Sequence, residues 1–212
     1  MTIPNLMKFK RRGGSSEEVE TKGGVGGDTH VSSYMPIGAV ITSMGRGYQA
    51  MTTTAGVGQV ARPTTAPLAT LYNGESGGSM SYLIERAFAH QLVSTSDASH
   101  FAIWLCVHPV GTDIDIADTI TTKNSTRGKS GYAGNANLAL ATAVADDGWF
   151  PWSNSVSGAT AANEPGAVAI AEVQGRIIIP PLGSLSIAVV SSDAVQTFVV
   201  GFHWYEEQID LG

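Results

Sequence analysis

The last third of the chain restricts the fold more than any other part, because it contains short apolar segments separated by glycine and proline. Residues 167–173 alternate between small and larger side chains, and residues 176–179 lead into a turn that begins at Pro180. Residues 185–190 and 197–205 follow as runs rich in β-branched and aromatic residues. This spacing predicts an antiparallel β-sandwich. Nothing resembling a catalytic constellation lies among these segments, so we expect a scaffold rather than an enzyme.

Length and composition are consistent with one folded domain. The chain has 212 residues, 43% hydrophobic and 14% charged, which is enough to bury one substantial core. Its single cysteine, Cys106, lies inside the apolar run 101–107 and is predicted to be an inert, buried thiol. No run approaches the roughly 18 apolar residues of a membrane-spanning helix, and residues 1–9 lack the apolar block of a signal peptide. We therefore expect a soluble protein without a membrane partner.

Charge divides the chain into an N-terminal arm, residues 1–33, and a body, residues 34–212. The first twelve residues carry a charge of +4 and the rest carries −10, because the chain as a whole has a net charge of −6. Residues 13–27 are rich in glycine and glutamate and cannot bury enough apolar surface to fold alone. The sequence therefore predicts an extended, mobile arm. Its basic residues are Lys8, Lys10, Arg11 and Arg12.

Three roles are open for this arm: a solvated tail, a nucleic-acid contact, or a clasp on a neighbouring protein. Four positive charges are few beside the about 6–10 phosphate contacts of a strong nucleic-acid binder. We therefore do not expect the arm alone to package nucleic acid, and we favour contact with a neighbouring subunit.

The body is predicted to be β-structure almost throughout. Short strands are expected within 37–43, 48–54, 56–61 and 67–72, and a turn is expected at 73–78, where asparagine and glycine tolerate unusual backbone angles. Residues 80–94 fit either a bulged strand or a helix, because Leu83, Ala87 and Gln91 are four apart. The flanking turn signals favour the strand. Residues 100–108 then return as a second β run.

The middle of the chain, from residue 109 to residue 166, gives weaker signals. Residues 136–144 fit a short helix or a small-residue strand, and residues 153–166 read as a long polar loop, which is typical of a functional surface. Asp113, Asp115 and Asp118 could supply oxygen ligands to calcium. They lack the EF-hand pattern, and acidic residues on a strand edge also prevent unwanted pairing, which is the interpretation we favour.

Signals for other metal, cofactor or catalytic sites are weak. His100 and His108 would lie about 26 Å apart along one strand, too far to share an ion. The chain has no paired-cysteine zinc motif and no nucleophile elbow around a serine. The Gly128-Lys129-Ser130 sequence lacks the earlier glycine of a phosphate loop, because position 123 is Lys123. We predict neither enzymatic activity nor a cofactor.

Two aromatic groups are candidates for core or contact. Trp149, Phe150 and Trp152 could stack on a sugar, anchor a protein interface or plug one end of the sandwich. We favour the plug, and an interface is the contact we predict if these residues meet another protein. Phe202 and Trp204 share one parity of the last strand and should face the core, whereas His203 should point the other way.

The basic glycine-rich arm, the segment RIIIPPLGSLSI at 176–187 and the segment VVGFHWYEEQ at 199–208 together resemble structural proteins of viral particles. The resemblance is to small bacteriophage virion proteins with jelly-roll bodies, and it covers residues 34–212. It implies a homo-oligomer in the virion, of the capsid shell, cement or decoration type, with copies of itself and other virion proteins as partners. The alternative is a receptor- or carbohydrate-binding module of a phage fibre or tail.

Overall fold

The computed structural model divides into two compact units, Met1–Ile37 and Gly38–Gly212, which are treated separately below. The residues that the structure describes are 6–10, 16–20, 37–64, 66–77, 79–94, 99–112, 114, 119–120, 122–125, 135–140, 148–158 and 166–209.

The N-terminal unit contains two short strands, β1 (Leu6–Lys10) and β2 (Ser16–Glu20). They pair antiparallel, with Met7 opposite Val19 and Lys8 opposite Glu18 in the register. The sequence predicted an extended arm here, and this pairing was not anticipated. Arg11 and Arg12 lie outside the described residues.

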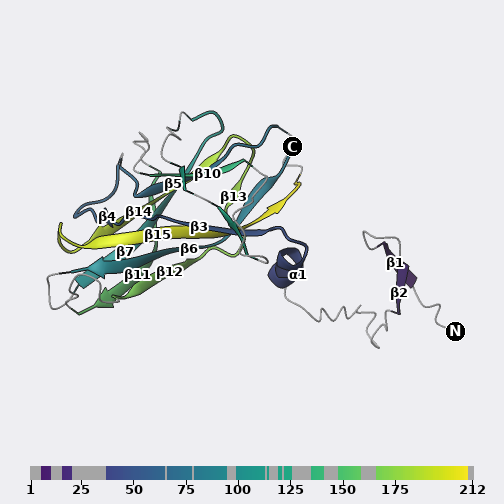
Figure 1. Cartoon of the computed structure of the whole chain (residues 1–212), viewed down its shortest axis with the longest axis horizontal. Helices are drawn as coiled ribbons and strands as arrows, with labels where there is room; N and C mark the ends of the chain where they lie inside the picture. The colour runs from purple at the N-terminus through teal and green to yellow at the C-terminus, as the bar shows by residue number, and fades with distance from the viewer. Residues whose placement is uncertain are drawn as a thin grey trace. The chain divides into compact units, whose positions relative to one another are not determined.

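The described residues of the body form one helix and a series of strands, shown in Figure 1. They are α1 (Ile37–Ser43), β3 (Gly47–Met51), β4 (Gly56–Val57), β5 (Ala69–Asn73), β6 (Ser81–Val93), β7 (Ser99–His108), β8 (Thr119–Ile120), β9 (Lys123–Asn124), β10 (Ala136–Leu140), β11 (Phe150–Ser157), β12 (Val168–Glu172), β13 (Ile178–Ile179), β14 (Ser184–Ser191) and β15 (Thr197–Glu207).

Eight of these strands pair in a nested order. β3 pairs with β15, β5 with β14, β6 with β12 and β7 with β11. The first of the eight strands therefore pairs with the last, and each later pair lies between the two members of the pair before it in the sequence. β15 also pairs with β6, and β14 with β7, which joins the pairs into two antiparallel sheets. Nested antiparallel connectivity in two sheets is the arrangement of a jelly roll. The predicted all-β sandwich is therefore confirmed.

The strands between β7 and β11 extend both sheets on one side. The first sheet runs β11-β7-β14-β5-β10-β8 and the second runs β12-β6-β15-β3-β9. Figure 1 shows β15, coloured yellow, passing through the middle of the body beside β6 and β3. β11 and β12 are the outer strands of the two sheets on the opposite side, and contacts between them bring these outer strands together.

The core lies between the two sheets. On β15 the inward positions Phe198, Phe202 and Trp204 are almost completely buried, whereas His203 is only partly covered, as the parity of this segment predicted. The Phe101 ring of β7 packs on the Phe198 ring at 4.8 Å between centroids, which joins one sheet to the other. Residues 80–94 are confirmed as a strand, β6.

Helix α1 corrects the strand predicted for residues 37–43. The segment contains β-branched residues that favour strands, but tertiary packing overrides this preference. At Gly38 a β-carbon would lie 2.4 Å from the Tyr205 hydroxyl, so only glycine lets the helix approach β15 so closely. Gly45, with φ of 79°, ends the turn that follows the helix and donates its N–H to the carbonyl of Thr42 at 2.8 Å.

Strand β11 corrects part of the long polar loop predicted for residues 153–166. Ser153, Asn154 and Ser155 pair with β7 in an antiparallel register. Their polar side chains are compatible with a strand at the edge of a sheet, where one side meets solvent. Residues 159–165 lie outside the described part of the chain.

Candidate interaction surface

The outer face of the second sheet carries apolar residues where a solvated sheet face normally carries polar ones. Ile170, Phe88, Gly201 and Met51 are successive register partners across β12, β6, β15 and β3. Ile170 is 44% exposed and Met51 is 48% exposed. Val168, two residues before Ile170 on the same face of β12, is 46% exposed. We call Met51, Phe88, Val168 and Ile170 the apolar face.

Gly201 shapes the middle of this face. A β-carbon at Gly201 would lie 2.7 Å from the nearest ring carbon of Phe88 and 2.6 Å from the carbonyl oxygen of Ala50. The ring of Phe88 therefore occupies the space that a side chain would need. It also contacts His203 edge to face, with 5.9 Å between the ring centroids. The sequence identified neither Gly201 nor Phe88, because their closeness depends on the register between β6 and β15.

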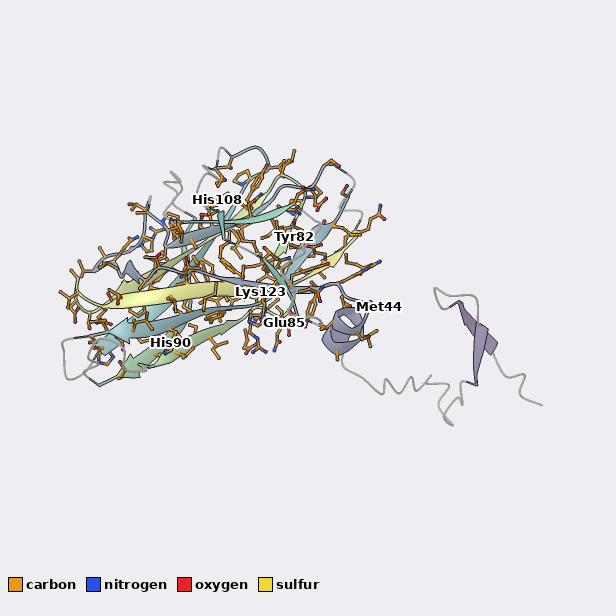
Figure 2. The ribbon with its side chains drawn as sticks, viewed as in Figure 1. Met44, Tyr82, Glu85, His90, His108 and Lys123 are labelled. Atoms are coloured by element: carbon orange, nitrogen blue, oxygen red, sulfur yellow. The ribbon has the colours of Figure 1, made fainter. Side chains whose placement is uncertain are left out.

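A polar row borders the apolar face. Glu172, Arg86, His203 and Gln49 are register partners across the same four strands. Arg86 Nη2 and Glu172 Oε1 are 4.0 Å apart, and both side chains are nearly half exposed, so this ion pair contributes little stability. Burial, with a smaller contribution from Arg86, lowers the pKa of His203. Figure 2 labels Glu85 and His90, which lie on β6 before Arg86 and after Phe88 respectively.

A hollow of about 400 Å³ opens beside the apolar face, at the outer strands β11 and β12. Its lining consists of Phe150, Pro151, Trp152, Ile170, Glu172 and Arg176, and we call it the edge hollow. Phe150 is 63% exposed, and its ring meets that of Trp152 edge to face at 6.2 Å.

The Arg176 side chain is held in place within the edge hollow. Its guanidinium carbon lies 5.3 Å from the ring centroid of Trp152, in a cation–π contact. Arg176 Nε donates to the carbonyl of Val173 at 2.9 Å, and Nη2 donates to the carbonyl of Glu172. Trp152 donates from Nε1 to the same Glu172 carbonyl at 3.4 Å. These contacts fix one basic group and one aromatic ring beside the Glu172 carboxylate.

The structure separates the three aromatic residues that the sequence grouped together. Trp149 is 4% exposed and packs with Cys106, Ala188 and Trp104. Trp149 is therefore a packing residue in this structure, as the favoured plug interpretation expected, and its role at an interface stays a prediction. Phe150 and Trp152 line the edge hollow. Lys8 and Lys10 lie on β1, in the N-terminal unit.

Trp149 covers a buried polar cluster that the sequence did not reveal. His108 Nε2 and Ser186 Oγ are 2.7 Å apart, and Ser186 Oγ is 2.7 Å from Thr70 Oγ1. Cys106 Sγ lies 3.8 Å from His108 Nδ1, and Trp149 contacts the imidazole edge to face. Ser186 is completely buried, so a substrate cannot reach its hydroxyl. The cluster stabilises the fold, and the predicted burial of Cys106 is confirmed.

A second hollow, of about 230 Å³, lies between α1 and the second sheet. Thr42, Tyr48, Arg86, His203 and Tyr205 are among the residues that line it. Burial is the main cause that raises the pKa of both Tyr48 and Tyr205, and hydrogen bonds to Asn124 and Thr42 respectively act in the opposite direction. These hydroxyls already have protein partners, so the hollow is a polar seam that attaches α1 to the sheet.

Within the described residues, no cluster of three or more His, Cys, Asp or Glu side chains is placed to hold a metal ion. Asp113, Asp115 and Asp118 lie outside this part of the chain. The described part also contains no helix with the length and apolar character needed to cross a membrane. Comparison with protein-family models, curated proteins and solved structures finds no match to this chain.

Proposed function

We propose that this chain is a non-enzymatic structural protein of a viral particle, of the capsid shell, cement or decoration type, and that it assembles into a symmetric oligomer. The apolar face is the observation that carries the proposal. Contiguous exposed apolar surface on a soluble domain marks an interaction site. Here Met51, Val168 and Ile170 are exposed, and the partly exposed Phe88 lies between Ile170 and Gly201 in the register, beside the polar row of Glu172, Arg86 and His203.

The jelly-roll connectivity supports a particle protein, because viral capsid domains use this arrangement. The same fold also serves lectins and other proteins, so the surface must carry the functional argument. The unit Met1–Ile37 adds a second line of support. Its one described hairpin, β1 with β2, has five residues in each strand. A two-stranded hairpin alone is marginally stable in water, so this unit gains by docking on a neighbouring protein.

Val168→Lys tests the proposal in the full chain. A lysine at this 46% exposed position leaves the monomer folded but places a charge in the interface. Losing an interface anchor costs about 2 kcal/mol or more, so we expect self-association to weaken about 30-fold or more. Analytical ultracentrifugation over a dilution series measures the effect, and negative-stain electron microscopy reports whether particles form.

Val110→Lys is the matched control. Val110 is 57% exposed and lies in the turn that follows β7, away from the apolar face. The same substitution there changes net charge equally and should leave assembly unchanged. A wild-type protein that stays monomeric at high concentration, or equal effects of the two substitutions, would contradict the proposal.

A carbohydrate-binding role is the second candidate, and the edge hollow is the specific observation that favours it.

A further inference from the structure

The edge hollow has the size and composition of a small-ligand site. Its volume of about 400 Å³ falls in the range of about 300–1,000 Å³ that is usual for ligand pockets. Most of its lining is aromatic or aliphatic, with one carboxylate from Glu172 and one guanidinium from Arg176. Apolar and aromatic side chains beside a few polar groups that fix the orientation of a ligand are common in binding sites.

Phe150 supplies an open aromatic surface. It is 63% exposed and begins β11, where it lies opposite Leu105 of β7. Its position is fixed by that pairing and by the edge-to-face contact with Trp152. Because Arg176 already lies over the ring of Trp152, the ring of Phe150 offers the more open platform for a ligand. Carbon-bound hydrogens of a sugar ring suit such a platform, since the aromatic face is electron-rich.

The polar groups of the hollow retain hydrogen-bonding capacity. Arg176 has five N–H donors, and its bonds to the carbonyls of Val173 and Glu172 use Nε and Nη2. Nη1 has no acceptor among the described residues. The Glu172 carboxylate reaches Arg86 only at 4.0 Å, so its oxygens can accept from a ligand. The guanidinium can donate to one hydroxyl group of a ligand, and the neighbouring carboxylate can accept from an adjacent hydroxyl group.

From this geometry we propose that the edge hollow binds a neutral pyranose, such as the terminal sugar of a glycan. The sugar ring stacks on Phe150, and two adjacent hydroxyls bond to Arg176 and Glu172. The hollow carries one negative group, Glu172, and one positive group, Arg176, so its charges largely cancel and a neutral ring that can both accept and donate hydrogen bonds is favoured. This proposal rests on the carbohydrate-binding candidate named above, specifies its ligand, and goes beyond the structural role. It shares only Ile170 with the apolar face, so assembly and sugar binding can be tested separately.

The experiment uses the full chain and a panel of methyl pyranosides: glucoside, galactoside, mannoside and N-acetylglucosaminide. Saturation-transfer NMR detects binding, and titration of tryptophan fluorescence measures it, since Trp152 lies in the hollow. A ligand of about 13 non-hydrogen atoms that gains about 0.3 kcal/mol of binding free energy per atom should have a dissociation constant of about 1 mM. Failure of all four sugars to bind at about 20 mM would overturn the proposal.

Three variants locate the site. Arg176→Lys keeps the charge but removes the planar fork, and Phe150→Ser removes the platform; each should weaken binding about tenfold or more. Arg62→Lys, in the loop before β5, is the matched control and should bind like the wild type. Circular dichroism confirms that each variant is folded. Undiminished binding in both hollow variants would place the sugar elsewhere and refute the assignment.

A fourth variant separates this inference from the proposed function. Val168→Lys should weaken assembly while leaving sugar binding within about twofold of the wild type. Sugar binding in a protein that never assembles would support the hollow and reject the structural role. Assembly without sugar binding would support the structural role and reject the sugar site. Competition for the hollow by an extended peptide, with no sugar bound, would show that β11 is a strand-docking edge and would also overturn the proposal.

Discussion

Trp149 should contribute to the stability of the fold and not to binding. Its replacement by alanine tests the different roles that the structure gives to Trp149 and Trp152. The side chain is 4% exposed and covers Cys106, Ala188 and the edge of His108. Removing a buried tryptophan side chain costs about 3–5 kcal/mol. Domains of this kind have a total stability of about 5–15 kcal/mol, so Trp149→Ala should remove a large part of it.

Urea unfolding, followed by far-ultraviolet circular dichroism, measures this loss. Trp152→Ala is the comparison, and it should cost only about 1–2 kcal/mol, because Trp152 is partly exposed and loses mainly its contacts with Arg176 and the Glu172 carbonyl. Trp149→Phe keeps a ring over His108 and removes an indole N–H that has no acceptor among the described residues. We expect it to cost less than about 1.5 kcal/mol. A Trp149→Ala protein as stable as the wild type would refute this reasoning.

Three further predictions concern other parts of the chain. Deleting residues 1–27 should leave the body folded but weaken assembly, as sedimentation would report; equally tight assembly would exclude the clasp. Because the pKa of His203 is lowered in the fold from its ordinary value of 6.5, the native state binds fewer protons than the unfolded state. The contribution of His203 to stability is therefore complete above about pH 6.5 and is lost as the pH falls from there toward the lowered pKa of the folded state. The melting temperature of the His203→Gln variant should depend less on pH than that of the wild type between about pH 7.5 and about pH 5. Cys106→Ala should cost on the order of 1 kcal/mol in urea unfolding and leave assembly intact; assembly lost with the fold retained would indicate an intermolecular role.

Alternation and turn residues were enough to predict the sandwich, because its long strands have one buried face. Phe202 and Trp204 are buried and His203 is partly exposed, as a period of two requires. At the turn after β5, Asn73 accepts from the Glu75 N–H at 3.1 Å and donates to the Met80 carbonyl, which is the local chemistry that favours asparagine there. These signals are local, so the sequence contains them.

Features that depend on distant partners could not be predicted in the same way. The helix at 37–43 places Gly38 against Tyr205, far along the chain, and local sequence does not show such a contact. Trp149 is buried beside Cys106 and Ala188, whereas Trp152 lies on β11 at a register irregularity between Pro151 and Ser153, and neither placement is visible in the local sequence. The apolar face requires the alignment of three separate segments, so the sequence pattern gave no sign of it.

The nested pairing of strands also sets the order in which a growing chain can fold. The Val200 N–H bonds to the hydroxyl of Thr52, 148 residues earlier, so this contact cannot form until residue 200 has been synthesised. β7 and β11 are the innermost pair and can associate first, whereas β3 waits for β15. Folding dominated by such distant contacts is slow. Until β15 emerges from the ribosome, β6 and β3 lack the strand between them, so their edges need protection from other nascent chains.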